Sequence, residues 1–315
     1  WQNYGKIEAT CRTSAGQNGT RTRHSIASDR IEGEVAVFSR LPGAIFRAAL
    51  VVLLIVTPSV MLSVGHAAGM QFTAFIALIA GIFTIVEYSA SSPSLVEFRS
   101  APPFNRLRFG ALLLTVFTLS IVFREGPEPS TLTMFFQAIG ERIGASIDFP
   151  YSPIRLLLLA MPQSASADVL DHIRTAAGLS YLISLMSLAI FVILLRLRGW
   201  PSKAGTFNVW VNLPTFDPTV GGDVVDRLNR DSQINLILGF LLPFMVPAIL
   251  KMSAVLIGPF PIDNSQTMIW AVTAWAFLPA SLLMRGVALN RVAQMIYVQR
   301  KRAYAKAAAD GMLPV

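Results

Sequence analysis

The sequence predicts an all-α integral membrane protein, a bundle of six transmembrane helices. Of its 315 residues, 53% are hydrophobic and only 14% are charged, whereas about a quarter of the residues of a soluble domain carry a charge. The apolar residues also gather in six runs separated by polar segments. These runs lack the in-out alternation of a lipid-facing strand, so we expect helices rather than barrel strands.

The six spans follow from the length of each apolar run. A helix rises about 1.5 Å per residue, so roughly 20 apolar residues cross a bilayer. The third run is short and needs Leu107 and a snorkelling Arg108 at its start. We expect one transmembrane domain over 40–290, with spans at about 45–65, 68–87, 107–123, 178–196, 234–251 and 267–285.

The two terminal segments differ from this domain. Residues 1–39 are polar and lack helical periodicity, which predicts a disordered or non-native tail. Residues 291–315 are basic and predict a C-terminal helix or tail outside the bilayer.

The distribution of Lys and Arg predicts the orientation. With six spans, 21 of the 26 basic residues lie on the side of the two termini, so we expect both termini in the cytoplasm and the protein in the inner (plasma) membrane. Because the basic residues adjoin apolar runs, anionic lipid headgroups are the expected partner, and nucleic acid is not. The candidates for headgroup contact are Arg196, Arg198, Trp200, Lys203, Arg285, Arg300, Lys301 and Arg302.

Two segments between the spans have distinct patterns. In the 124–177 loop, one face of an amphipathic helix predicts interfacial helices; it holds Leu132, Phe135, Ile139 and Ile143. Residues 207–231 predict a short irregular or β-like cytoplasmic connector. Its carboxylates could form a cation or acid-base site, but capping and turn roles are favoured; they are Asp217, Asp223, Asp226 and Asp231.

We find no catalytic constellation and expect no cofactor or metal. Asp168 and His172 are one helical turn apart, but two ligands fall short of the four of a structural site. Cys11 is the only cysteine, which excludes an intramolecular disulfide.

Polar and proline positions inside the spans could form a substrate path or a gate. Pro243 and Pro247 predict a bent fifth span, which is either a gating kink or a static bend filled by a neighbouring helix. The polar residues that could line a path are Gln71, Thr84, Ser184, Ser187, Thr273 and Ser281. No formal charge lies in the middle of a span, which disfavours an ion-coupled transporter.

Three hypotheses of function remain. The first is a non-enzymatic structural, assembly or interaction subunit, with a protein partner or as a homo-oligomer. The second is a transporter or channel-like carrier of an uncharged or lipid-like substrate. The third is a membrane enzyme on the outer face, where Asp168, Asp171 and His172 would have to converge on Glu125, Glu128 or Glu141.

Overall fold

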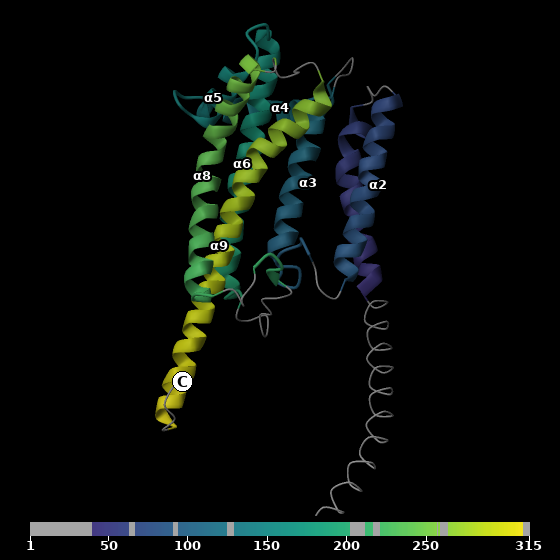
Figure 1. Ribbon diagram of the computed structural model, residues 1–315. Coiled ribbons are helices and arrows are strands. Elements are labelled where there is room, and N and C mark those ends of the chain that lie inside the picture. The colour runs from purple at the N-terminus through teal and green to yellow at the C-terminus, as the bar shows by residue number, and fades with distance from the viewer. Residues whose placement is uncertain are drawn as a thin grey trace, which may run out of the picture.

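The protein is a bundle of helices, six of which are long and apolar enough to cross a membrane (Figure 1). The computed structural model describes residues 40–62, 67–90, 94–124, 129–201, 212–216, 221–256, 258 and 264–310, and these contain no strand. The six long helices are Arg40–Met61, α2 (Ala67–Ser89), α3 (Phe104–Val122), α6 (Ala167–Arg198), α8 (Val224–Leu256) and α9 (Ser265–Ala309). Their number and order agree with the predicted spans.

Helices α6, α8 and α9 extend well beyond the apolar runs that predicted them. Helix α6 begins after Ser166, whose hydroxyl accepts from the backbone N–H of Val169, and it ends at Gly199 with a left-handed φ of 58°. Helix α8 begins directly after Asp223. Apolar composition locates only the part of a helix in lipid, whereas caps and polar helical turns set its ends.

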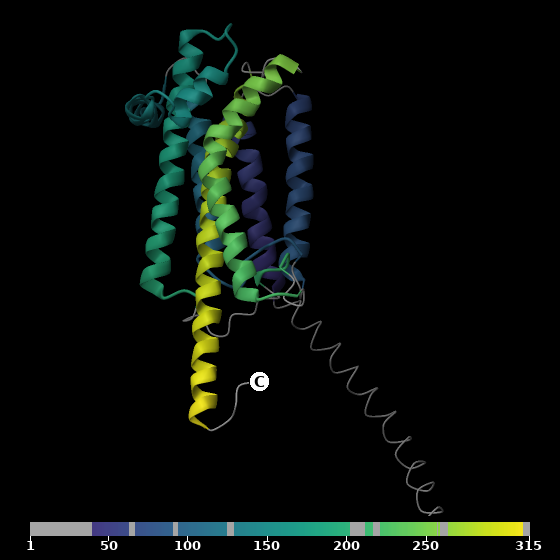
Figure 2. The same ribbon diagram turned by 60° about the vertical axis from the view of Figure 1, so that its left-hand side comes forward.

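The two ends of the bundle differ in charge. We call one the basic end: the helix Arg40–Met61 and α3 and α8 begin there, α2 and α6 end there, and α9 projects beyond it (Figures 1 and 2). Its basic residues include Arg40, Arg47, Arg99, Arg106, Arg108, Arg196, Arg198, Arg227, Arg230, Arg285 and those of the α9 projection. The other end, here the opposite end, holds the loops and short helices between α3 and α6.

Close contacts between backbones hold α8 against α9. A Cβ added to Gly239 would lie 2.9 Å from the carbonyl oxygen of Pro279, and one added to Gly286 would lie 3.0 Å from that of Ser232. The hydroxyl of Ser232 donates to the Gly286 carbonyl at 2.8 Å. Small residues at such crossings are how helices associate in lipid, where the hydrophobic effect between them is weak.

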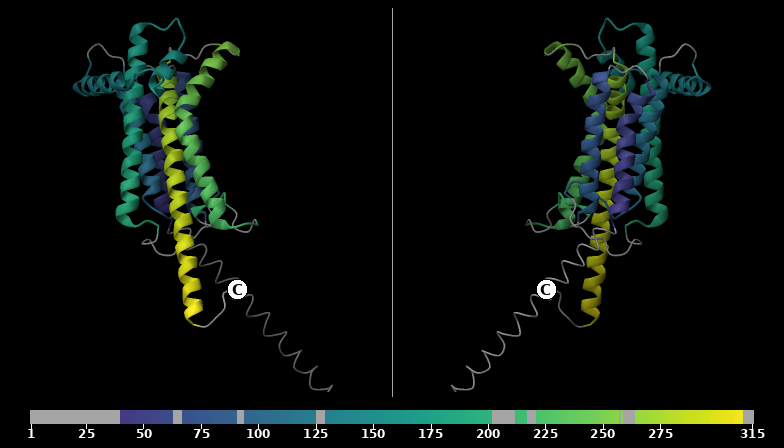
Figure 3. Two further views of the ribbon diagram at one scale, coloured as in Figure 1. Left: turned by 90° about the vertical axis from the view of Figure 1, so that its left-hand side faces the viewer. Right: turned by 90° about the vertical axis from the view of Figure 1, so that its right-hand side faces the viewer.

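Two short helices cover the opposite end, α4 (Thr131–Ile147) and α5 (Pro153–Ala160). Helix α4 lies crosswise to the long helices (Figure 3) and packs its glycines on α6, where a Cβ at Gly178 would lie 2.6 Å from the Gly144 nitrogen. Leu132 and Phe135 of the predicted apolar face stay exposed, at 59% and 56%. Ile139 and Ile143 of the same face are half-buried. An interfacial position of α4 remains a prediction.

The described part of the predicted connector, residues 212–216, lies against the loop between α2 and α3. The carbonyl of Asn212 accepts from the backbone N–H of Phe98 at 2.7 Å, and its side-chain oxygen accepts from Ser100. Leu213 and Phe216 are buried. Residues 207–211 and 217–220 of the predicted connector lie outside the described residues.

Candidate functional site

A polar network at the basic end joins elements that are far apart in the sequence. Its centre is Glu97, in the loop before α3, whose carboxylate binds Arg285 of α9 through two bonds of 2.6 and 2.7 Å. Thr215 of the connector donates to the same carboxylate at 3.0 Å. The side chains of Arg285 and Glu97 are 28% and 11% exposed, so the pair is largely withdrawn from solvent. The bridge ties the connector and the loop to α9.

Arg108 extends this network into the bundle. Its guanidinium donates to the hydroxyl of Ser281 on α9 and lies over the ring of Phe104, 4.9 Å from the ring centre. Its Nε is buried without a hydrogen-bond partner among the described residues. Ser281, one of the predicted path residues, therefore accepts a hydrogen bond from Arg108.

Glu87, near the end of α2, is almost completely buried, at 3% exposure. Its carboxylate accepts from the backbone N–H groups of Ser94, Leu95 and Val96, at 2.6 to 2.9 Å. Three backbone donors stabilise a carboxylate much as a helix N-terminus does. Arg99 donates to the carbonyls of Glu87 and Ala90. The hydrogen bonds of Glu87 and Arg99 therefore hold together the turn that follows α2.

The two prolines of α8 are buried beside α9. Pro247 lacks an N–H and therefore leaves the carbonyl of Pro243 without its helical partner. The indole N–H of Trp275 donates to that carbonyl at 3.0 Å, and α8 bends along its length (Figure 3). Because the Pro243 carbonyl has a hydrogen-bond partner on α9, the contact favours a static bend of α8 over a gating kink.

A second charged cluster lies at the opposite end. Asp148 contacts Arg155 at 2.8 Å and Arg174 at 3.0 Å, and Arg174 also pairs with Asp171. The side chain of Asp148 is only 6% exposed. Its two ion pairs join the end of α4 to α5 and α6.

The predicted outer-face site does not assemble in the described part of the chain. Asp168 and His172 are exposed on α6, and no group of three or more His, Cys, Asp or Glu there could hold a metal ion. Asp171 is paired with Arg174. Glu125 and Glu128 lie outside the described residues, and Glu141 is exposed on α4.

The other predicted site residues are scattered. Gln71 is exposed on α2, whereas Thr273 is buried in α9. Arg196 and Arg198 are exposed at the end of α6, but Trp200 is 6% exposed and packs on Phe98, with ring centres 5.6 Å apart. Lys203 lies outside the described residues. Lys301 and Arg302 are exposed on the α9 projection, and Arg300 pairs there with Asp223 at 2.7 Å.

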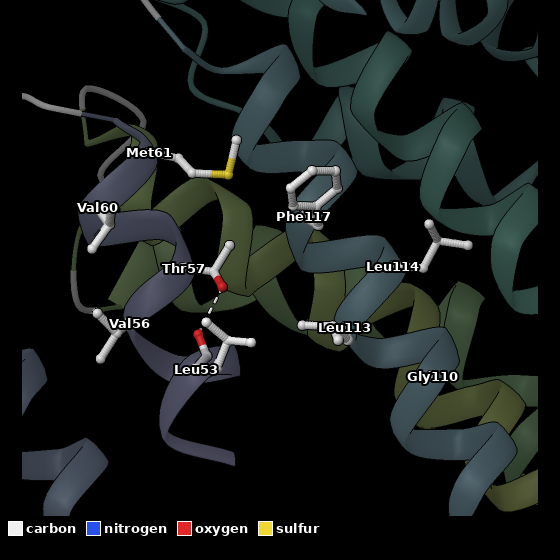
Figure 4. A pocket seen from close by; sticks show the side chains of 9 residues that line it. All are labelled: Leu53, Val56, Thr57, Val60, Met61, Gly110, Leu113, Leu114 and Phe117. Carbon is white, nitrogen blue, oxygen red and sulfur yellow. Dashed lines mark hydrogen bonds between the residues drawn. The ribbon is translucent and has the colours of Figure 1, made fainter. Parts of the chain in front are cut away.

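Two neighbouring pockets lie between the helix Arg40–Met61 and α3. The larger one, of about 510 Å³, is lined by aliphatic and aromatic side chains of these two helices (Figure 4). In Figure 4, Thr57 and Met61 face Leu113 and Phe117 across it. The hydroxyl of Thr57 donates to its own helix, to the Leu53 carbonyl at 2.7 Å, so the wall is apolar in effect. The second pocket lies nearer the basic end.

The second pocket, of about 450 Å³, is more polar. Arg47 and Arg106 lie at its rim with Tyr88 of α2 and Asn105, and the guanidinium of Arg47 stands 4.8 Å from the centre of the Tyr88 ring. Phe109 lines this pocket and Gly110 lines the apolar one. The two pockets therefore follow each other along the same pair of helices.

Comparisons with known proteins identify no relative of this chain. No protein-family model matches it, and neither a curated protein nor a solved structure does.

Neither the role of Glu97 nor the two neighbouring pockets is evident from the sequence. Arg285 was placed at a span end, but its partner is 188 residues away in the chain, and sequence spacing gives no signal for such a pairing. One signal could have indicated the pairing. Glu97 is a carboxylate in a short loop between two spans, and Arg108 and Arg285 lie at the ends of two spans on the same side.

Proposed function

We propose that the protein is a non-enzymatic membrane subunit that serves assembly or interaction, and that its basic end faces the cytoplasm. The observation that carries this proposal is the projecting end of α9. Residues 297–309 continue the helix beyond the bundle for about 20 Å, and nearly all of them are exposed. We call this segment the α9 arm.

The α9 arm has the composition of a docking element. It carries Arg300, Lys301, Arg302 and Lys306 beside the exposed rings of Tyr297 and Tyr304, which are 59% and 55% exposed. Arginine and tyrosine are enriched at protein interfaces. The positive charge suits an acidic partner surface.

The charges of the bundle support a structural role. Glu97 with Arg285, Glu87 with backbone N–H groups, and Asp148 with two arginines each hold neighbouring segments together. A catalytic carboxylate or a coupling site needs a group that can exchange partners with a substrate. These three carboxylates are occupied by the fold itself.

The excess of basic residues at one end supports the proposed orientation, because basic loops are retained in the cytoplasm. A reporter enzyme fused after residue 315 tests it. We expect cytoplasmic activity from that fusion, and external activity would contradict the orientation.

The experiment that tests the subunit is purification after gentle solubilisation, followed by identification of stoichiometric partners. Replacing Lys301, Arg302 and Lys306 by Gln should release a partner that the wild-type chain retains. A matched control replaces the exposed Arg142 and Lys251 of the opposite end by Gln and should retain it. A solitary, monodisperse wild-type protein with a bound small molecule would instead support a carrier.

The second candidate, a carrier of an uncharged or lipid-like substrate, is favoured by one observation. The apolar pocket between the helix Arg40–Met61 and α3 has walls that suit such a molecule. Substrate uptake into vesicles containing the purified protein would support this candidate, and a Trp275→Phe variant would show whether the bend of α8 takes part.

A further inference from the structure

We propose that the two pockets between the helix Arg40–Met61 and α3 form one binding site for an anionic phospholipid. Its phosphate would lie between Arg47 and Arg106, and an acyl chain would lie in the apolar pocket. This goes beyond both candidate functions, because a resident lipid is compatible with a subunit and with a carrier.

The charge at the rim is the first argument. Arg47 and Arg106 are exposed where the first helix and α3 begin, and neither has a carboxylate partner in the described part of the chain. The Arg47 guanidinium donates to the Gly43 carbonyl of its own helix at 2.7 Å. Both arginines line the same pocket, so an anion there would be attracted by two positive charges. Arginine is well suited to bind phosphate oxygens with two N–H groups.

The neighbouring arginines add to this positive potential. Burial lowers the pKa of Arg99, and the positive charges of Arg40 and Arg47 lower it further, whereas Glu87 and Tyr88 act in the opposite direction. The carboxylate of Glu87 accepts from backbone N–H groups, and that of Glu97 binds Arg285. Among the described residues, the excess of arginines at this corner of the basic end therefore favours a bound anion.

The depth of the site is the second argument. Arg106 lies in the first turn of α3 and Arg47 about two turns into the first helix, near the level at which headgroups are expected. Tyr88 lies beside Arg47 near the end of α2. Aromatic side chains with a polar tip favour this level of a bilayer. The rim therefore has the residues that a headgroup site requires.

The shape of the apolar pocket is the third argument. From Arg47 to Met61 the first helix rises by about 21 Å, which exceeds the depth of roughly 15 Å of one leaflet of hydrocarbon. Gly110 opens the wall of α3, because a Cβ added there would meet nothing within 4 Å. An acyl chain anchored by its phosphate at the rim would fill this space.

The test compares lipids added to the purified protein in detergent micelles. Native mass spectrometry would count bound lipid, and thermal unfolding would report stabilisation. We expect one phosphatidylglycerol molecule to bind tightly and raise the unfolding midpoint, and phosphatidylcholine to bind more weakly. Equal binding of the two lipids would overturn the proposal.

Variants of the rim test the phosphate contact. Arg47→Gln and Arg106→Gln should each weaken phosphatidylglycerol binding about fivefold, and the double variant about 25-fold, because each basic side chain contributes a comparable attraction near an anionic headgroup. Arg198→Gln, an exposed arginine of the basic end on α6, is the matched control and should bind as the wild type does. An equal loss in this control would show a general surface attraction and overturn the site.

Variants of the apolar pocket test the acyl chain. Gly110→Phe should fill the pocket and abolish tight binding, whereas Leu78→Phe, at an exposed position of α2 outside the pocket, is the matched control and should bind as the wild type does. Thermal unfolding of both variants without added lipid checks that each one folds. Tight binding by Gly110→Phe, or full competition by inorganic phosphate, would show that no acyl chain occupies the pocket and would overturn the lipid assignment.

Discussion

Helices α2 and α9 are both apolar enough to cross a membrane, but they have different positions in the bundle. In the apolar window of α9, 56% of the residues are buried inside the protein, against 22% in that of α2. Helix α9 contacts α3, α6 and α8, whereas α2 lies beside the first helix at the edge of the bundle (Figure 1). Lipid tails are almost as favourable an environment for an apolar side chain as a protein core is. Apolar composition alone therefore does not place a helix at the centre of the bundle.

The central helices and α2 at the edge of the bundle pack through different kinds of contact. The central helices use glycines at their crossings and polar contacts such as Trp275 with Pro243 and Arg285 with Glu97. The outer face of α2 consists of large exposed side chains such as Phe72, Phe75 and Leu78. Matched substitutions in the two regions should therefore have very different effects on stability.

The largest effect is expected at the bridge between Glu97 and Arg285. Arg285→Leu should lower the free energy of unfolding by about 3 kcal/mol, because it leaves a largely buried carboxylate unpaired. The measurement is unfolding of the protein in detergent micelles by added dodecyl sulfate. The double variant with Glu97→Gln should lose less than the sum of the two single variants; simple additivity would show that the two groups are not coupled.

Shortening an apolar side chain should lower the free energy of unfolding more at the centre of the bundle than at its edge. Leu119→Ala, at a fully buried position of α3, should cost about 2 to 3 kcal/mol, since the lost packing contacts leave a cavity. Leu78→Ala on α2, where the side chain is 59% exposed, should change the same free energy by less than about 0.5 kcal/mol. Equal costs would indicate that another molecule or a second copy covers α2.

Two glycine substitutions should change the free energy of unfolding in opposite directions. Gly178→Ala should destabilise the protein by about 1 to 2 kcal/mol, because the new Cβ would lie 2.6 Å from the backbone nitrogen of Gly144. Gly110→Ala should stabilise it by about 0.5 kcal/mol, since alanine favours the helix and the position is open. Thermal unfolding of both variants in the same detergent measures the contrast.

The smallest effect is expected where α9 leaves the bundle. The backbone N–H of Val225 and the Arg300 guanidinium lower the pKa of Asp223. The contact is therefore fully formed above the ordinary aspartate pKa of about 3.9 and is lost as the pH falls through the lower folded value.

Hydrogen exchange of residues 297–309, corrected for the intrinsic rate at each pH, measures this contact. We expect reduced protection in Asp223→Asn at neutral pH, and convergence of variant and wild type in acid. Asp226→Asn, in the first turn of α8, is the control and should behave as the wild type does. A pH dependence that persists in Asp223→Asn would contradict the assignment.

The sequence by itself determined the helical class, the six spans and the excess of basic residues at one end, because these depend on local composition and on run length. It also favoured a capping or turn role for Asp223, which accepts from the backbone N–H of Val225 at the start of α8, since a cap acts within a few residues. Only the tertiary structure decided which helices are central and that Trp275 satisfies the carbonyl exposed by Pro247. It also decided that Glu97 binds Arg285 and that Arg47 and Arg106 share a pocket. Such pairings join residues far apart in the chain, and no local pattern encodes which distant group will lie opposite.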